Sequence, residues 1–279
     1  MKEIFKIPEL DQYFFLPEEI VKNLNRLEKL SHKHPINIMI TGKQGCGKSS
    51  LVKQFAAYYK RPLVTFQVGL LSEPGQLFGE KIIKDGNVVF EEYLFPRAIR
   101  TEGCVIHLEE INRPEHPKAL NELFSVLSEE RSIWIESLGL QKVADRVIFF
   151  ATLNEGPEFT GIEFLDAALR DRFYTIHLDY PDEKTEIEIV NLKTGLPKKH
   201  AERVVKTVNT LRNNEQTPIS ISTRHCLMIA ELMMMGATLR EGLIYSLEIG
   251  KNELESILMS LHFEEGEKEK TKKKFIKYI

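Results

Sequence analysis

A glycine-rich segment near the N-terminus carries the residues of this chain that are best suited to chemistry. Residues Gly42 to Ser49 read G-K-Q-G-C-G-K-S and fit the pattern G-x-x-x-x-G-K-[ST]. Backbone N–H groups of such a loop, together with the N-terminus of the helix that follows, can hold a phosphate chain. Lys48 would reach the β- and γ-phosphates, and the Ser49 hydroxyl would bind Mg²⁺. The segment therefore predicts a nucleoside triphosphate site rather than a glycine-rich turn with a surface lysine.

The remaining residues of this loop are expected to support the same site. Gly42, Gly45 and Gly47 permit turns that a side chain would obstruct. Cys46 and Ser50 complete the predicted nucleotide-binding set. Cys46 is expected to be a tolerated small residue rather than a redox centre.

A pair of acidic residues at the end of an apolar run is the second chemical feature. Val105–Leu108 is followed directly by Glu109 and Glu110. The end of such a strand, beside the loop in a parallel sheet, lies next to the bound phosphates. Glu109 would hold Mg²⁺ through water, and Glu110 would orient an attacking water as its base. The alternative interpretation is a strand that simply meets solvent at two acids.

The elements that must position these residues follow from the apolar pattern. Five apolar runs predict strands, at residues 36–40, 63–68, 104–108, 147–151 and 174–178. Helical stretches lie between them, among them an amphipathic helix at 17–30 and a helix at 50–59. The alternation predicts an α/β fold with a mainly parallel sheet. Apolar runs around turn residues at 81–90 and 133–143 predict two hairpins, within inserts near 70–95 and 133–145.

After Pro181 the strand pattern stops and only helical stretches remain. These stretches are broken at residues 195–197, at 217–218 and at Gly236. We therefore expect an α/β nucleotide-binding core at 1–180 and a smaller helical lid domain at 181–279. The run Met233–Met235 is expected to belong to the core of that lid.

Composition limits the functional classes. Charged residues make up 28% and hydrophobic residues 42% of the chain, as in an ordinary soluble globular protein. The net charge of −3 gives no electrostatic argument for nucleic acid or an anionic membrane. The three cysteines are scattered, and His32, His34 and His116 form no metal-spaced cluster. Without a membrane-length apolar run or a signal-peptide core, the expected location is cytoplasmic.

The residues around the acid pair resemble a known family. Glu109 to Pro114, followed by Leu120–Leu123 and Leu127–Arg131, resemble the MoxR-type branch of the AAA+ ATPases, which includes NorQ/CbbQ, GvpN and dynein-related members. The likeness extends over residues 36 to 240. The family usually has Asp-Glu where this chain has Glu109–Glu110. Because glutamate is one methylene longer, the distance to the metal would change.

The resemblance implies a P-loop NTPase (AAA+) core with a parallel five-stranded sheet, followed by a small all-helical lid, and it implies roles for further residues. Asn154 matches the sensor that hydrogen-bonds the γ-phosphate or the attacking water; the alternative is an asparagine that caps a strand end. In the segment 165–173, Arg172 matches the arginine finger that reaches a neighbour's nucleotide, with Arg170 second. The alternative for either is a surface ion pair with an adjacent aspartate. Arg224 matches the arginine sensor of the lid domain; the alternative is an arginine that simply lies at the start of a helix. His107 is expected to be a core residue without chemistry.

The same resemblance implies an activity. It predicts an ATPase that uses ATP and Mg²⁺, forms a homo-oligomeric ring (usually a hexamer) and remodels a protein client in complex assembly or metalloenzyme maturation. A partner with a von Willebrand A domain often accompanies such proteins, and the two hairpins face the pore or substrate side of the ring in relatives.

Two other functional classes stay open. One is a nucleic-acid-stimulated motor or a restriction-type NTPase subunit, in which Lys81 and Lys84 would grip a backbone. The other is a non-hydrolysing nucleotide-gated scaffold, which is suggested by Glu109 at a position where the family usually has aspartate. No base-specifying motif distinguishes ATP from GTP.

Overall fold

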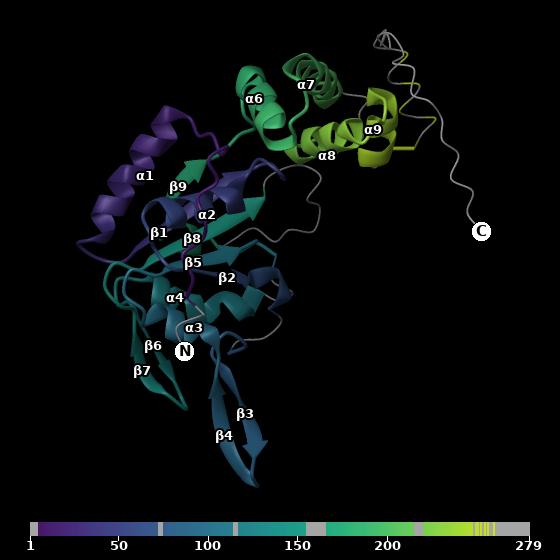
Figure 1. The fold of residues 1–279 in the computed structure, drawn as a ribbon. Helices are drawn as coiled ribbons and strands as arrows, with labels where there is room; N and C mark the ends of the chain where they lie inside the picture. Colours follow the sequence, from purple (N-terminus) through teal and green to yellow (C-terminus); the bar gives the residue numbers. More distant parts are fainter. Residues whose placement is uncertain are drawn as a thin grey trace. The chain divides into compact units, whose positions relative to one another are not determined.

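A parallel five-stranded sheet is the framework of the N-terminal part of the chain (Figure 1). Its strands are β1 (Ile36–Gly42), β2 (Leu63–Gln67), β5 (Val105–Glu109), β8 (Ile148–Asn154) and β9 (Tyr174–His177). They lie in the order β2-β5-β8-β1-β9, and each neighbouring pair is parallel. Every residue of β1 and β8 is buried, which explains why these strands read as continuous apolar runs. The expected parallel five-stranded sheet is confirmed.

The computed structural model describes residues 5–71, 75–113, 117–154, 166–214, 220–247, 249–250, 252, 254, 256 and 259. Several predictions lie outside the described residues: Pro114 and His116, Leu165, and the helix break at 217–218. The chain divides into two compact units, Met1–Asp179 and Tyr180–Ile279. Within the described residues, no helix is both long and apolar enough to span a membrane.

Helices and short turns complete the first unit. They are α1 (Glu18–Ser31), α2 (Lys48–Tyr58), α3 (Leu94–Ile99), α4 (Asn121–Leu127) and α5 (Ala167–Arg170), with the 3₁₀ turns η1 (Val68–Leu70) and η2 (Pro117–Leu120). Helix α2 starts at Lys48 rather than at the expected Ser50, because Gly47 takes a φ of 101° as its N-cap and ends the loop there. The first turn of α2 therefore contains both Lys48 and Ser49.

Both expected hairpins are confirmed. Strands β3 (Gly79–Lys84) and β4 (Asn87–Glu92) pair antiparallel, as do β6 (Ser132–Ile135) and β7 (Gly139–Lys142). The two hairpins project on the same side of this unit (Figure 1), and Lys81 Nζ lies 3.5 Å from a carboxylate oxygen of Glu136. Ile83 and Trp134 are 79% and 72% exposed on them. Apolar side chains are thus presented to solvent on two adjacent hairpins.

The regular elements of the second unit, within its described residues, are all helices. It contains α6 (Glu183–Thr194), α7 (Lys198–Arg212), α8 (Thr223–Met234) and α9 (Leu239–Ser246). Asp182, Ser222 and Thr238 cap the N-termini of α6, α8 and α9. The expectation that the methionine run lies in the core is wrong for Met234 and Met235, which are 45% and 86% exposed. Met233 packs against the core from the last turn of α8, Met234 ends the helix with an exposed side chain, and Met235 follows the helix end.

A buried ion pair ties three helices of this unit together. Glu186 of α6 is fully buried, and its carboxylate accepts hydrogen bonds from Arg212 of α7 at 3.0 and 3.2 Å. Thr223 of α8 donates to the same carboxylate at 2.7 Å. The Arg212 guanidinium also stacks 4.3 Å from the centre of the Tyr180 ring. The charge of Glu186 is thus compensated by groups on two other helices.

We predict that Arg212→Met destabilises the second unit by about 3–5 kcal/mol, because Glu186 would keep a buried charge without its partner. Hydrogen exchange of the α6 to α8 amides in the full chain measures the effect. Lys206→Met on α7 is the matched control, since the Lys206–Glu202 pair is exposed and its loss should change little. Equal protection in the two variants would contradict the role assigned to the pair.

Candidate functional site

The glycine loop between β1 and α2 has the backbone shape that phosphate binding requires. Gly42, Gly45 and Gly47 have φ values of 147°, 72° and 101°. A Cβ atom on Gly42 would lie 2.0 Å from the carbonyl oxygen of Leu178, so no other residue fits there. The Lys48 ammonium donates to the carbonyl oxygens of Gly42 at 2.8 Å and Lys43 at 2.7 Å. Its charge is therefore held directly over the loop.

Cys46 and Ser50 are the other small residues of the predicted nucleotide-binding set. Cys46 is 8% exposed, and burial raises the pKa of its thiol above the ordinary range. A thiol that stays protonated is a poor nucleophile, which agrees with the interpretation of Cys46 as a tolerated small residue. Ser50 lies in the first turn of α2, one residue after Ser49.

The structure brings Ser49 and Glu109 together. The Ser49 hydroxyl donates to one oxygen of the Glu109 carboxylate, and the Gln67 amide donates to the other oxygen. Gln67 and Glu109 are register partners at the ends of β2 and β5. A hydroxyl and a carboxylate at one point are hard oxygen ligands of the kind that Mg²⁺ takes beside nucleotide phosphates. These residues therefore fit the metal.

Glu110 and Asn154 form a second pair beside the first. The Asn154 side-chain amide donates to Glu110 Oε1 at 3.1 Å, and Asn154 is the last residue of β8. Glu110 has a φ of 53°, which is uncommon for a residue with a side chain, and its backbone N–H donates to Thr152 Oγ1 at 3.3 Å. Backbone strain of this kind is concentrated at functional sites. The carboxylate is thus aimed by two groups of the neighbouring strand.

Among the described residues, no group of three or more His, Cys, Asp or Glu side chains could hold a metal. A Mg²⁺ ion at Ser49 and Glu109 would then depend on phosphate oxygens and water for the rest of its ligands, as is usual for this ion.

Arg170 is the last residue of the short helix α5, and Arg172 lies just after that helix. Arg170 is exposed, and Arg172 is half-buried with its guanidinium 5.0 Å from the centre of the Phe124 ring. Arg172 also donates to the carbonyl oxygen of Ala168, while its Nε is buried without a hydrogen-bond partner among the described residues. Within that part of the chain, neither arginine forms an ion pair with Asp166 or Asp171. Asp166 instead caps α5 by accepting from the Ala168 N–H.

Arg172 is not brought to the loop of its own chain. Its carbonyl oxygen accepts a hydrogen bond from Asn37, near the start of β1, whereas the loop follows the end of β1 at Gly42. Five residues of strand correspond to roughly 16 Å. An arginine side chain does not cover that distance, so any contact of Arg172 with a nucleotide would be with one bound to another subunit.

Arg224 lies in the second unit, exposed in the first turn of α8. Ser222 caps this helix in a capping box with His225. The sensor role of Arg224 stays a prediction.

Comparison with known proteins decides the family. The AAA domain family of the dynein-related subfamily matches residues 37–173, and the CbbQ/NirQ/NorQ C-terminal family matches residues 186–250. BssE of Thauera aromatica, described as a candidate chaperone, is 53% identical over 264 residues, which are 95% of this chain and 92% of BssE. This chain belongs to the MoxR-type AAA+ ATPases. The AAA domain implies that it binds ATP.

Other MoxR-type relatives are more distant. NorQ of Paracoccus denitrificans is 27% identical over 72% of this chain and 75% of its own length. The gas vesicle ATPase GvpN of Ancylobacter aquaticus is 27% identical, covering 78% of this chain and 66% of GvpN. Among solved structures, RuvB of Thermotoga maritima superposes with a TM-score of 0.56 at 16% identity, over 90% of this chain and 72% of that one. The RuvB likeness shows a shared fold.

Two residues with a place in this arrangement were not singled out from the sequence. Gln67 ends a strand next to β5, and a search for polar residues at every strand end would have found it. Asn37 lies near the start of β1 inside an apolar run. A polar amide at such a position is expected to be buried and to need hydrogen-bond partners within the protein, which could have marked it.

Gly42 gives a direct test of the loop geometry. We predict that Gly42→Ala lowers the free energy of unfolding by about 3 kcal/mol or more, because the new Cβ overlaps a backbone carbonyl. Gly103→Ala is the matched control: Gly103 also has positive φ, at 70°, but its Cβ would meet open space. It should lose only about 1–2 kcal/mol. Urea unfolding compares the two, and similar losses would show that the Leu178 contact does not constrain the loop.

Proposed function

We propose that this MoxR-type protein is a Mg²⁺-dependent ATPase that works as a homo-oligomeric ring, most simply a hexamer, and remodels a protein client. The observation that carries the proposal is the convergence of three strand ends. Lys48 and Ser49 lie in the segment after β1. Glu109 is the last residue of β5 and Glu110 follows it, while Asn154 is the last residue of β8. Groups for binding phosphate, metal and water thus lie along one edge of a single sheet.

Each of these residues has a distinct task in the proposed reaction. The loop N–H groups and Lys48 would bind the phosphates, and Ser49 and Glu109 would hold Mg²⁺. Bound Mg²⁺ supplies charge neutralisation on the β- and γ-phosphates. Glu110 would accept a proton from the attacking water, while Asn154 fixes the carboxylate and orients that water. Gln67 would hold the longer Glu109 side chain in place.

Arg172 supports a site that is completed between subunits. Its distance from its own loop leaves it able to act only on a neighbour's nucleotide. A guanidinium at that position would meet the charge that develops on the transferred phosphoryl group. In the second unit, Arg224 would sense the same phosphate and couple nucleotide state to the lid.

A chaperone-like role is supported by the similarity to BssE. The exposed side chains Ile83 and Trp134 give the two hairpins apolar surfaces with which to contact a protein client. We propose assembly of a protein complex or maturation of a metalloenzyme as the setting, with a von Willebrand A domain protein as a partner.

Arg172→Ala tests the shared site. We predict that the variant assembles like the wild type and loses about 10³-fold or more of its turnover, because the finger charge is removed from the transition state. Phosphate release and sedimentation velocity measure the two properties. Arg170→Ala, two residues earlier at the end of α5, is the matched control and should keep most of its turnover. Near-normal phosphate release by Arg172→Ala would sink the assignment, and a loss confined to Arg170→Ala would move it to Arg170.

A further inference from the structure

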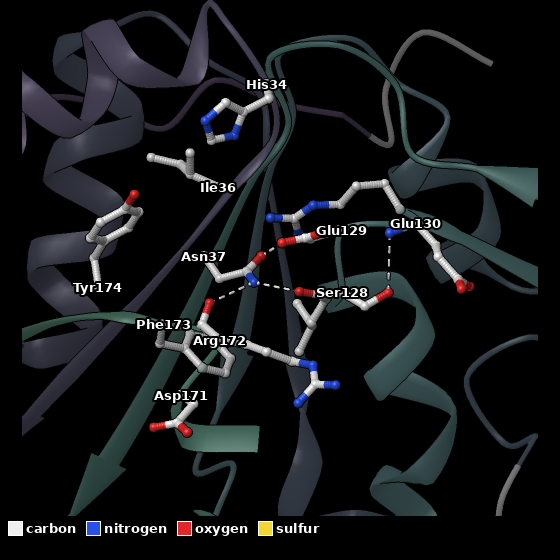
Figure 2. Close-up of a pocket in the computed structure, with 12 residues that line it drawn as sticks. His34, Ile36, Asn37, Ser128, Glu129, Glu130, Asp171, Arg172, Phe173 and Tyr174 are labelled. Carbon is white, nitrogen blue, oxygen red and sulfur yellow. Dashed lines mark hydrogen bonds between the residues drawn. The ribbon is translucent and has the colours of Figure 1, made fainter. Parts of the chain in front are cut away.

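A pocket of about 920 Å³ lies at the start of β1, between the end of α4 and the segment 171–174 (Figure 2). Its wall includes Arg172 and, at its centre in the figure, the side chain of Asn37. Asn37 is 2% exposed. It lies near the start of β1, the strand whose other end carries the glycine loop. A buried amide in an apolar strand has to satisfy its hydrogen bonds within the protein.

The Asn37 amide joins three segments that are distant in sequence. Its Nδ2 donates to the carbonyl oxygen of Arg172 at 2.9 Å and to that of Leu127 at 2.9 Å. Its Oδ1 accepts from the Arg131 guanidinium at 2.5 Å. Figure 2 shows the Arg172 side chain extending away from Asn37, so Asn37 holds the backbone of Arg172 and does not engage its guanidinium.

Arg131 fixes which way the Asn37 amide faces. A guanidinium carries only donors, so it requires the amide oxygen on its side and turns the NH₂ group toward the two carbonyls. Arg131 is itself anchored, because it donates to the Pro35 carbonyl oxygen at 2.9 Å and has a φ of 47°. Burial lowers the pKa of its guanidinium to about 10, which still leaves it charged at neutral pH. The orientation of Asn37 is thus set by a fixed cation.

We propose that Asn37 is a positioning residue for Arg172, which it ties to the strand that carries the glycine loop of the same subunit. The inference rests on the proposed function, because it assigns Asn37 to the arginine that completes a neighbour's site. Strand β1 is buried along its whole length and paired on both edges, so it is a rigid element. Through Asn37, the loop at one end of β1 and Arg172 at the other keep a fixed separation.

Asn37→Asp is the most selective variant. It keeps the shape and the oxygen that Arg131 needs, and it removes both N–H donors. We expect assembly like the wild type and ATP affinity within about twofold, while kcat falls about 10- to 100-fold, since a displacement of about 1 Å has such effects. Tyr174→Phe is the control: it removes a hydroxyl from the same pocket and should leave kcat unchanged.

Mixed oligomers separate positioning of Arg172 from damage to the subunit's own site. A Glu110→Gln subunit has no base but supplies an intact Arg172, whereas an Asn37→Asp subunit has an intact site and a misplaced Arg172. Alone, the Glu110→Gln subunit should be nearly inactive, and the Asn37→Asp subunit should keep at most about a tenth of wild-type activity. Mixed in equal amounts, they should regain up to about a quarter of wild-type activity, because a quarter of randomly formed interfaces pair a good site with a good finger.

The mixture of Arg172→Ala with Glu110→Gln tests the shared site separately from the role of Asn37. Recovery in both mixtures supports the inference. If the Arg172→Ala mixture recovers and the Asn37→Asp mixture does not, Asn37 does not act through Arg172 and the inference is overturned, while the shared site stands. If the Arg172→Ala mixture stays inactive, the shared site falls and the inference falls with it. Full turnover of Asn37→Asp alone would also overturn it.

Discussion

The register of the parallel sheet is the constraint on which the site depends. Hydrogen bonding between β1 and β8 sets Gly42 opposite Asn154, and pairing of β2 with β5 sets Gln67 opposite Glu109. Because parallel strands end at the same edge, residues far apart in the sequence, such as Gly42 and Asn154, lie side by side there. A slip of one residue would turn each of these side chains to the other face of the sheet. The geometry of the site is therefore set by the pairing of the strands.

Polar groups inside the sheet reinforce that register. His107 is fully buried in β5, its Nε2 lies 3.2 Å from Thr152 Oγ1 in β8, and burial lowers its pKa to about 4. It is therefore neutral at pH 7 and can hydrogen-bond without a charge cost, as expected for a core residue. The Thr152 hydroxyl also accepts from the backbone N–H of Glu110. A buried hydrogen-bond chain thus reaches from the strand interior to the proposed base.

Sequence reasoning succeeds where the information is local. The glycine loop, the acid pair and the Asp85–Gly86 hairpin are each encoded within a few residues, and the five apolar runs indicate the sheet. It misses Gln67 and Asn37 because their partners come from other strands and helices. It is wrong about Met234 and Met235 because hydrophobicity alone does not show which face of a helix is buried or where the helix ends. The roles of Arg172 and Arg224 cannot be read from one chain, since the first concerns a neighbouring subunit and the second a bound nucleotide.

We propose that the strand-end site hydrolyses ATP when subunits assemble. Phosphate release from ATP and Mg²⁺, measured over a range of protein concentrations, tests it most directly, with Glu110→Gln measured in parallel. We expect activity per subunit to rise with concentration to a plateau and to be lost in the variant. Activity that does not depend on concentration would contradict a site shared between subunits. Activity that survives in Glu110→Gln would contradict the role of Glu110.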